Sequence, residues 1–232
     1  MGHLLTDKVA LVAGGAGQTG PGIVRSLLRE DATVIVPARS ARDIGRLKEY
    51  VSSMAKGRLV TLLADYPDYD KAFDMADDIL SAFGRIDLAV AAFDSPAASR
   101  CLTELAITEW QKMADENITA GFVVGRVVLE AMKKRHGGMY VSMSHTCDFE
   151  KRPSSTLANI AATLQVEMAR MFCEGIKEYG VRYHHLFISN DVTGAPAPGD
   201  FIVQLYCGQA GDAGHLFQWP GRAPMAIEGP AA

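Results

Sequence analysis

The stretch that decides the fold lies near the N-terminus and reads Lys8-Val9-Ala10-Leu11-Val12-Ala13-Gly14-Gly15-Ala16-Gly17-Gln18-Thr19-Gly20. It predicts a buried strand over Val9–Ala13, a glycine-rich turn, and then a helix over Pro21–Glu30. In such a turn, glycines let the backbone approach a phosphate at the helix N-terminus, where free N–H groups and the helix dipole favour anions. The residues expected to contact the phosphate-bearing ligand are Gly14, Ala16, Gly17, Thr19 and Gly20.

Short β-branched runs alternate with segments of helical period along most of the chain. Because continuous apolar strands are buried on both faces, this order predicts a parallel sheet with helices on each side. The expected strands are Val9–Ala13, Thr33–Val36, Leu59–Leu63, Ile86–Ala91, Met139–Met143, Arg182–Ile188 and Leu216–Trp219. Later helices are expected over Asp70–Phe83, about Glu109–Lys134 and about Leu157–Glu178, the last ending near Gly180.

Local signals refine these boundaries. The residues Thr108-Glu109-Trp110-Gln111 have the spacing of a capping box and predict the start of the long helix. The Pro/Gly-rich stretch Gly194–Gly199 predicts a surface loop, and the tail Gly221–Ala232 predicts loose order.

The length and composition predict one domain. A chain of 232 residues with 48% hydrophobic content can bury one sizeable core. We expect a single α/β domain over residues 1–232, with a nucleotide-binding half at about 1–95 and a half bearing the catalytic cavity at about 96–220.

The charge and cysteine content narrow the classes of partner. A formal net charge of -4 gives no basic field for nucleic acid or an anionic membrane, so a small-molecule partner is expected. No stretch is long and apolar enough to cross a bilayer. Cysteines and histidines show no metal-ligand spacing, which predicts reduced thiols, no metal site and a cytoplasmic location. The four cysteines are Cys101, Cys147, Cys173 and Cys207.

Five further landmarks follow the glycine-rich turn in order. They are Asp65 after the third strand, Phe83–Leu88, Glu116–Gly121, Gly137–Ser144 and Tyr179–Arg182. Together with the turn they resemble the short-chain dehydrogenase/reductase family over about Lys8 to Thr193. The resemblance implies a Rossmann-like, doubly wound parallel sheet, a nicotinamide cofactor and oxidoreductase activity on a small molecule. It also implies a homo-oligomer, a dimer or tetramer formed through the two long helices.

The resemblance implies that the end of the second strand selects the cofactor. An acidic residue there would hold the ribose of NAD, whereas Ala38 is followed by Arg39 and Ser40, a cation and a hydroxyl suited to a 2′-phosphate. NADP(H) is therefore favoured, and the other expected cofactor-binding residues are Asp65, Ala92 and Thr193. The alternative is that Arg39 is an ordinary solvated surface arginine.

Two departures from the family pattern leave nucleotide binding open. Gln18 stands where the family has its middle glycine, and either Gly17 restores the turn or the Gln18 side chain crowds the pyrophosphate. The family's Asn-Asn-Ala-Gly segment is here Ala91-Ala92-Phe93-Asp94, which brings a ring and a carboxylate near the expected adenosine.

A third departure concerns catalysis, for which the family uses a Ser, a Tyr, a Lys four residues after the Tyr, and a helix Asn. Alignment from two landmarks places the Tyr on Ala158, the Lys on Ala162 and the Ser on His145. The stretch between Tyr140 and Tyr179 contains no other tyrosine. The resemblance thus implies a divergent member that lacks the Tyr/Lys pair.

Three residues remain as catalytic candidates. His145 aligns with the cavity left by Ala158 and can act as an acid or base near neutral pH, with Ser144 beside it. Asn117 matches the family's helix Asn. The alternatives are that His145 is a loop histidine satisfied by backbone and that Asn117 only bridges helix backbone at a kink. His184 and His185 are adjacent on a strand and should face opposite ways, which argues against a joint metal site.

The sequence leaves three functions open. The first is an atypical NADP(H)-dependent oxidoreductase with His145 as proton donor. The second is non-redox lyase, isomerase or cyclase chemistry in the same cavity. The third is a non-catalytic protein that binds a ligand or pairs with a partner.

Overall fold

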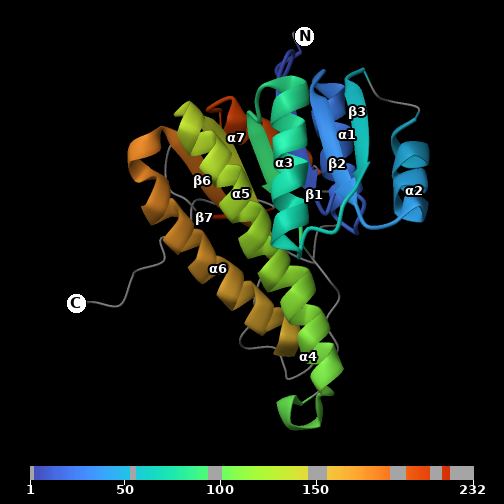
Figure 1. Ribbon diagram of the computed structural model, residues 1–232, viewed down its shortest axis with the longest axis vertical. Helices are drawn as coiled ribbons and strands as arrows, with labels where there is room; N and C mark the ends of the chain where they lie inside the picture. Colours follow the sequence, from blue (N-terminus) through green and yellow to red (C-terminus); the bar gives the residue numbers. More distant parts are fainter. Residues whose placement is uncertain are drawn as a thin grey trace.

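The computed structural model describes residues 3–52, 56–93, 101–145, 156–188, 197–209 and 216–219. Within them the chain forms a seven-stranded sheet of order β3-β2-β1-β4-β5-β6-β7, with every neighbouring pair parallel (Figure 1). The strands are β1 (Val9–Ala13), β2 (Thr33–Ala38), β3 (Arg58–Leu63), β4 (Leu88–Ala91), β5 (Gly138–His145), β6 (Val181–Ile188) and β7 (Leu216–Trp219). The sequence placed each of these strands correctly, with some ends shifted by one or two residues.

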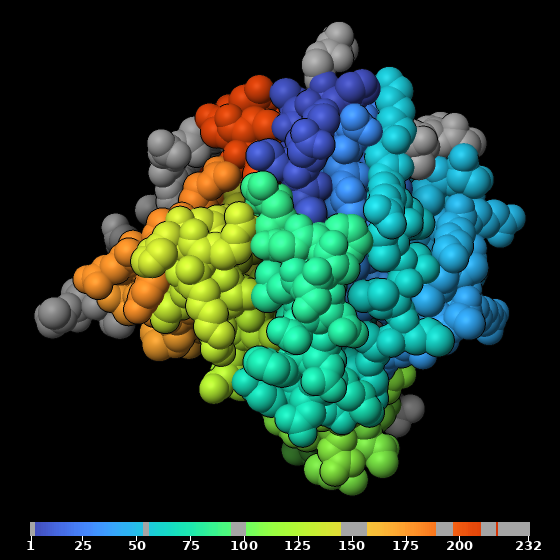
Figure 2. Space-filling model, turned by 45° about the horizontal axis from the view of Figure 1, so that its top comes forward, coloured from blue at the N-terminus to red at the C-terminus, as the bar shows by residue number. Residues whose placement is uncertain are grey.

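Helices cover both faces of the sheet, so the predicted doubly wound fold is confirmed. The α-helices are α1 (Gly20–Arg29), α2 (Ala41–Val51), α3 (Tyr69–Phe83), α4 (Ile107–Met113), α5 (Ala120–Arg135), α6 (Thr156–Ile176) and α7 (Pro198–Tyr206). Helices α1, α2 and α7 share one core with one face of the sheet, and α3, α5 and α6 share a second core with the other. Helices α3 and α5 lie side by side on this second face (Figure 2).

The two cores follow from the alternation of side chains along each strand. On β5, Met139 and Val141 enter the core under α1 and α7, whereas Tyr140 enters the core under α5 and α6. The strand order reverses between β1 and β4, and this is where open α/β sheets leave a crevice at the carboxyl ends of the strands.

The long helix expected from about Glu109 to Lys134 differs from the prediction in two ways. It starts earlier, at Ile107, and the Glu109 carboxylate accepts from the backbone N–H of Ala106 at 3.0 Å, so the predicted capping box at Thr108 is wrong. A π-helical segment, η2 (Ala114–Thr119), then interrupts the helix. Inside η2, Asn117 Nδ2 donates to the carbonyl oxygen of Met113 at 3.1 Å. A side chain that binds the preceding turn in this way competes with the regular helical hydrogen bonds.

The C-terminal region also corrects a prediction. Pro198 and Gly199 do not belong to a loop, because they begin α7, with the proline in the first turn where its missing N–H costs nothing. Helix α7 packs on α1 so closely that a Cβ on Gly199 would lie 2.8 Å from Ile23 Cα. Arg29 and Asp200 join the same two helices by an ion pair at 2.8 Å. The rest of the expected loop and the tail 221–232 lie outside the described residues.

Two short 3₁₀ segments complete the described structure, η1 (Leu102–Glu104) and η4 (Lys177–Tyr179). The second leads into Gly180, whose left-handed φ of 66° ends the α6 region as the sequence predicted. Among the described helices, none combines the length and the apolarity needed to cross a membrane.

Candidate functional site

The glycine-rich turn is held tightly between β1 and α1. Gly14 has a φ of +78°, and a Cβ there would lie 2.2 Å from the carbonyl oxygen of Ala92. A Cβ on Gly20 would lie 2.2 Å from the carbonyl oxygen of Gly14, to which the N–H of Gly17 donates at 2.9 Å. Gly14 and Gly20 therefore cannot be replaced without moving backbone, which is what the first and last glycines of such a turn require.

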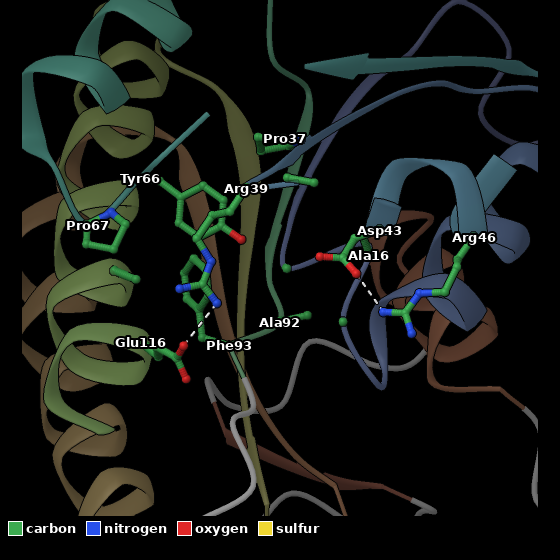
Figure 3. Close-up of a pocket in the computed structure, with 14 residues that line it drawn as sticks. Ala16, Pro37, Arg39, Asp43, Arg46, Tyr66, Pro67, Ala92, Phe93 and Glu116 are labelled. Atoms are coloured by element: carbon green, nitrogen blue, oxygen red, sulfur yellow. Dashed lines mark hydrogen bonds and ion pairs between the residues drawn. The ribbon is translucent and has the colours of Figure 1, made fainter. Parts of the chain in front are cut away.

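The turn opens on a cavity of about 190 Å3 at the crevice between β1 and β4 (Figure 3). Five of the predicted cofactor-binding residues come together around it: Gly14, Ala16, Gly17, Arg39 and Ala92. They follow the ends of β1, β2 and β4, so the parallel order of the strands is what brings them to one edge.

The other predicted residues lie around the cavity or outside the description. Thr19 and Gly20 begin α1 beside it. Ser40 caps α2, because its hydroxyl donates to the Asp43 carboxylate at 2.6 Å and accepts from the Asp43 N–H at 3.1 Å. Gln18 is exposed and does not line the cavity.

Asp65 lines an adjoining groove between β3 and α3, where its carboxylate lies 3.7 Å from Lys71 Nζ. Thr193 and Asp94 lie outside the described residues.

Arg39 is paired across the cavity. Its Nη2 atom lies 3.0 Å from Oε1 of Glu116, which belongs to η2 (Figure 3). Partial burial works against the charge on Arg39, but the hydrogen bond and the charge of Glu116 outweigh it and raise the pKa of the guanidinium. Arg39 is thus 52% exposed and ion-paired, which leaves both the cofactor contact and the surface arginine as predictions.

Two aromatic rings narrow the cavity. Tyr66 and Phe93 are 9% and 6% exposed, and their ring centroids lie 5.2 Å apart. Gln165 of α6 fixes the backbone here, since its Nε2 donates to the Phe93 carbonyl oxygen at 3.3 Å. Burial raises the pKa of the Tyr66 hydroxyl, so this phenol stays neutral. The rings help explain why the volume falls below the roughly 300–1,000 Å3 of typical ligand pockets.

The sequence missed Tyr66 and Glu116 as lining residues, although signals for both were present. Tyr66 follows the carboxyl end of β3, the edge where such sheets bind ligands. Glu116 precedes the family-like Asn117, but only the folded chain reveals its proximity to Arg39.

Two of the three catalytic candidates lie at the end of β5, and Asn117 lies on η2. His145 is the last residue of that strand and pairs in register with Ile188, while its side chain lies outside the described part of the structure. The Ser144 hydroxyl is buried and lies 2.9 Å from His185 Nε2. Asn117 is 4% exposed and donates to helix backbone, and its catalytic role stays a prediction.

Ser144 belongs to a buried polar network that the sequence did not predict. His185 Nδ1 lies 2.7 Å from Ser142 Oγ, and the Tyr183 hydroxyl donates to the same oxygen at 2.9 Å. Burial lowers the pKa of His185 to about 3, so its imidazole is neutral and needs one donor and one acceptor partner. The signal was the alternation of polar residues on β5 and β6, which period two places on one face.

His184 faces the other side of the sheet, where its ring centroid lies 5.3 Å from that of Phe217, so the prediction of opposite orientations is confirmed. Among the described residues, no group of three or more His, Cys, Asp or Glu side chains is placed to hold a metal ion.

Ala158 and Ala162 lie on α6, half-buried and buried respectively. Gln165 follows at helical spacing, and its amide reaches Phe93 at the end of β4. The stripe Ala158, Ala162 and Gln165 therefore faces the carboxyl edge of the sheet.

Comparison with known proteins gives the same fold. A profile of the short chain dehydrogenase family matches residues 8–163. A Caenorhabditis elegans protein named dehydrogenase/reductase SDR family member 4 is 22% identical over 175 residues, or 75% of this chain and 67% of the relative. An uncharacterized oxidoreductase of Staphylococcus epidermidis is 25% identical over 68% of this chain and 65% of its own. The chain thus spans about two thirds of the length of these relatives.

Solved structures agree in fold at low sequence identity. A metagenomic short-chain oxidoreductase in complex with NADP superposes with a TM-score of 0.76 at 18% identity, covering 93% of this chain and 97% of that one. An NAD+-bound xylitol dehydrogenase gives 0.75 at 15% identity, covering 92% and 80%. Since the family profile covers well over half of the residues, the chain belongs to the short chain dehydrogenase family.

Proposed function

We propose that this protein is an atypical oxidoreductase that binds NADP(H) and acts on a small molecule without the Tyr/Lys pair of its family. The observation that carries the proposal is the glycine turn. Gly14 lies so close to Ala92, and Gly20 so close to Gly14 and Gly15, that neither glycine tolerates a side chain. Such a constraint is expected where a turn must present N–H groups to a phosphate.

The chain's residues fit the phosphate-bearing part of a dinucleotide. The turn from Gly14 to Gly17 and the start of α1 would hold the pyrophosphate, and Arg39 would hold the 2′-phosphate. A bound nicotinamide cofactor supplies or accepts a hydride. Among the solved neighbours, one holds NADP and another NAD+, so support for the phosphorylated cofactor comes from Arg39 itself.

The chemistry would have to work without the usual proton donor. The alignment that assigns the Tyr and Lys positions to Ala158 and Ala162 leaves only methyl groups there, and methyl groups cannot donate a proton or support a ribose. We propose that His145 serves as the acid, because it ends β5 at the carboxyl edge of the sheet and an imidazole can donate a proton near neutral pH.

One variant tests this assignment directly. The double change Ala158→Tyr with Ala162→Lys should create weak NADPH-dependent reduction of ketones or quinones, followed by NADPH absorbance, that the wild type lacks on the same panel. Ala158→Phe with Ala162→Met is the matched control, since it adds similar volume without the acid or the cation. Brisk reduction of the whole panel by the wild type would refute the assignment of the two positions.

The two aromatic rings favour a second candidate function. Tyr66 and Phe93 occupy space at the expected adenosine side, which supports a protein that binds a smaller ligand, with non-redox or no chemistry. Calorimetric titration with NADPH and NADH separates the two. Binding of either supports the oxidoreductase, and binding of neither supports the second candidate.

A further inference from the structure

Four charged side chains line the described cavity, and they form two ion pairs. Arg39 Nη2 lies 3.0 Å from Glu116, and Arg46 Nη2 lies 2.6 Å from Asp43 (Figure 3). The lining therefore contains two cations and two anions. A pocket selected only for an extra phosphate would be expected to carry an excess of positive charge.

The two pairs differ in kind. Asp43 and Arg46 lie one turn apart on α2, and both are substantially exposed. Arg39 and Glu116 are separated by 77 residues and come from different elements, the end of β2 and η2. In this pair the acid is the more buried partner, because the Glu116 side chain is 15% exposed and that of Arg39 is 52% exposed.

A guanidinium binds a carboxylate and a phosphate with the same planar set of donors. If Arg39 turned toward a 2′-phosphate, its contact with Glu116 would weaken, so the phosphate would have to displace an ion pair that the guanidinium already makes. A ribose hydroxyl in the same place carries no charge and can donate to a carboxylate. Glu116 thus opposes the phosphorylated cofactor and has no comparable effect on the unphosphorylated one.

We propose that Glu116 is a specificity-determining residue, whose carboxylate competes with the 2′-phosphate of NADP(H) for Arg39 and so limits the preference of the pocket for NADP(H) over NAD(H). This inference rests on the proposed nucleotide function. It assigns the choice of cofactor to two residues from different elements. Of these, only Arg39 lies at the end of the second strand, the position that the family resemblance associates with cofactor choice.

The test compares the wild type with Glu116→Gln, which keeps the shape of the side chain and removes its charge. By isothermal titration we expect NADPH to bind roughly fivefold more tightly, because a half-exposed ion pair no longer competes for Arg39. The affinity for NADH should change less than about twofold. Glu130→Gln is the matched control, because Glu130 is an exposed residue of α5 paired with Lys134 at 3.1 Å, and its affinities should equal those of the wild type. Thermal melting checks that each variant is folded, and Glu116→Ala provides a second variant.

A double-mutant comparison isolates the competition. In an Arg39→Ala background, Glu116→Gln should give a clearly smaller gain for NADPH, because no guanidinium is left to release. Equal gains in both backgrounds, or unchanged NADPH affinity in folded Glu116→Gln, would overturn the inference while leaving nucleotide binding intact. Failure of all the proteins to bind either cofactor would overturn the proposed nucleotide function and this inference with it.

Discussion

The buried His185 should make the protein sensitive to mild acid. In the unfolded chain a histidine binds a proton below about pH 6.5, whereas in the folded protein the pKa of His185 is about 3. Between these values the unfolded state takes up the proton and the native state does not, so stability falls as the pH is lowered through this window. From this one group we expect a loss of about 2 kcal/mol between pH 7.5 and pH 5.0.

The measurement is urea unfolding at both pH values for the wild type and for His185→Gln, whose amide can still offer a donor and an acceptor to Ser142 and Ser144. The variant should lose about 2 kcal/mol less than the wild type on acidification, even if it is less stable at pH 7.5. His3→Gln, at an exposed position, is the control and should follow the wild type. Equal acid sensitivity of His185→Gln and the wild type would refute the reasoning.

Three further predictions concern the site. Gly14→Ala should lower the free energy of unfolding in urea by at least about 2 kcal/mol, because it combines a left-handed φ with a Cβ 2.2 Å from backbone. Gly45→Ala, in open space on α2, should raise it by roughly 0.5–1 kcal/mol. Phe93→Ala should lower the free energy of unfolding by roughly 3–5 kcal/mol. In folded protein it should strengthen the binding of NADPH measured by calorimetry, and unchanged affinity would show that the ring does not obstruct the nucleotide. Substitution of His145 by Ala should lower turnover by about 10²-fold or more with little change in Tm, and a fully active variant would remove His145 from the mechanism.

Most of the fold could be predicted from local patterns. The strand Val9–Ala13 was predicted with its observed ends, and the left-handed glycine at Gly180 marks the end of the α6 region, because apolar runs and turn glycines act within a few residues. The predicted start of the long helix was wrong because Ala106, whose side chain cannot form a cap, serves as the N-cap residue. The Glu109 carboxylate accepts from the Ala106 N–H instead. No residue preference for the N-cap position predicts a helix that begins at an alanine.

The candidate site could be predicted only in part. The glycine turn was visible because its residues are adjacent in sequence. The ion pair of Arg39 with Glu116 joins residues 77 apart, and the contact of Ser144 with His185 joins residues 41 apart. Such contacts depend on the order of the strands in the sheet and on where η2 packs. Local sequence patterns around the contacting residues do not specify either of these.

The packing of α7 on α1 has a consequence for how the chain folds as it is made. The apolar side of α1 that includes Ile23 is completed by a helix that ends at Tyr206. At roughly 5–20 residues per second, a ribosome needs about 9 to 35 seconds to reach that point after finishing α1. During this interval the nascent N-terminal half carries an uncovered hydrophobic stripe, so we infer that it reaches its final stability only after α7 has been synthesised and docked.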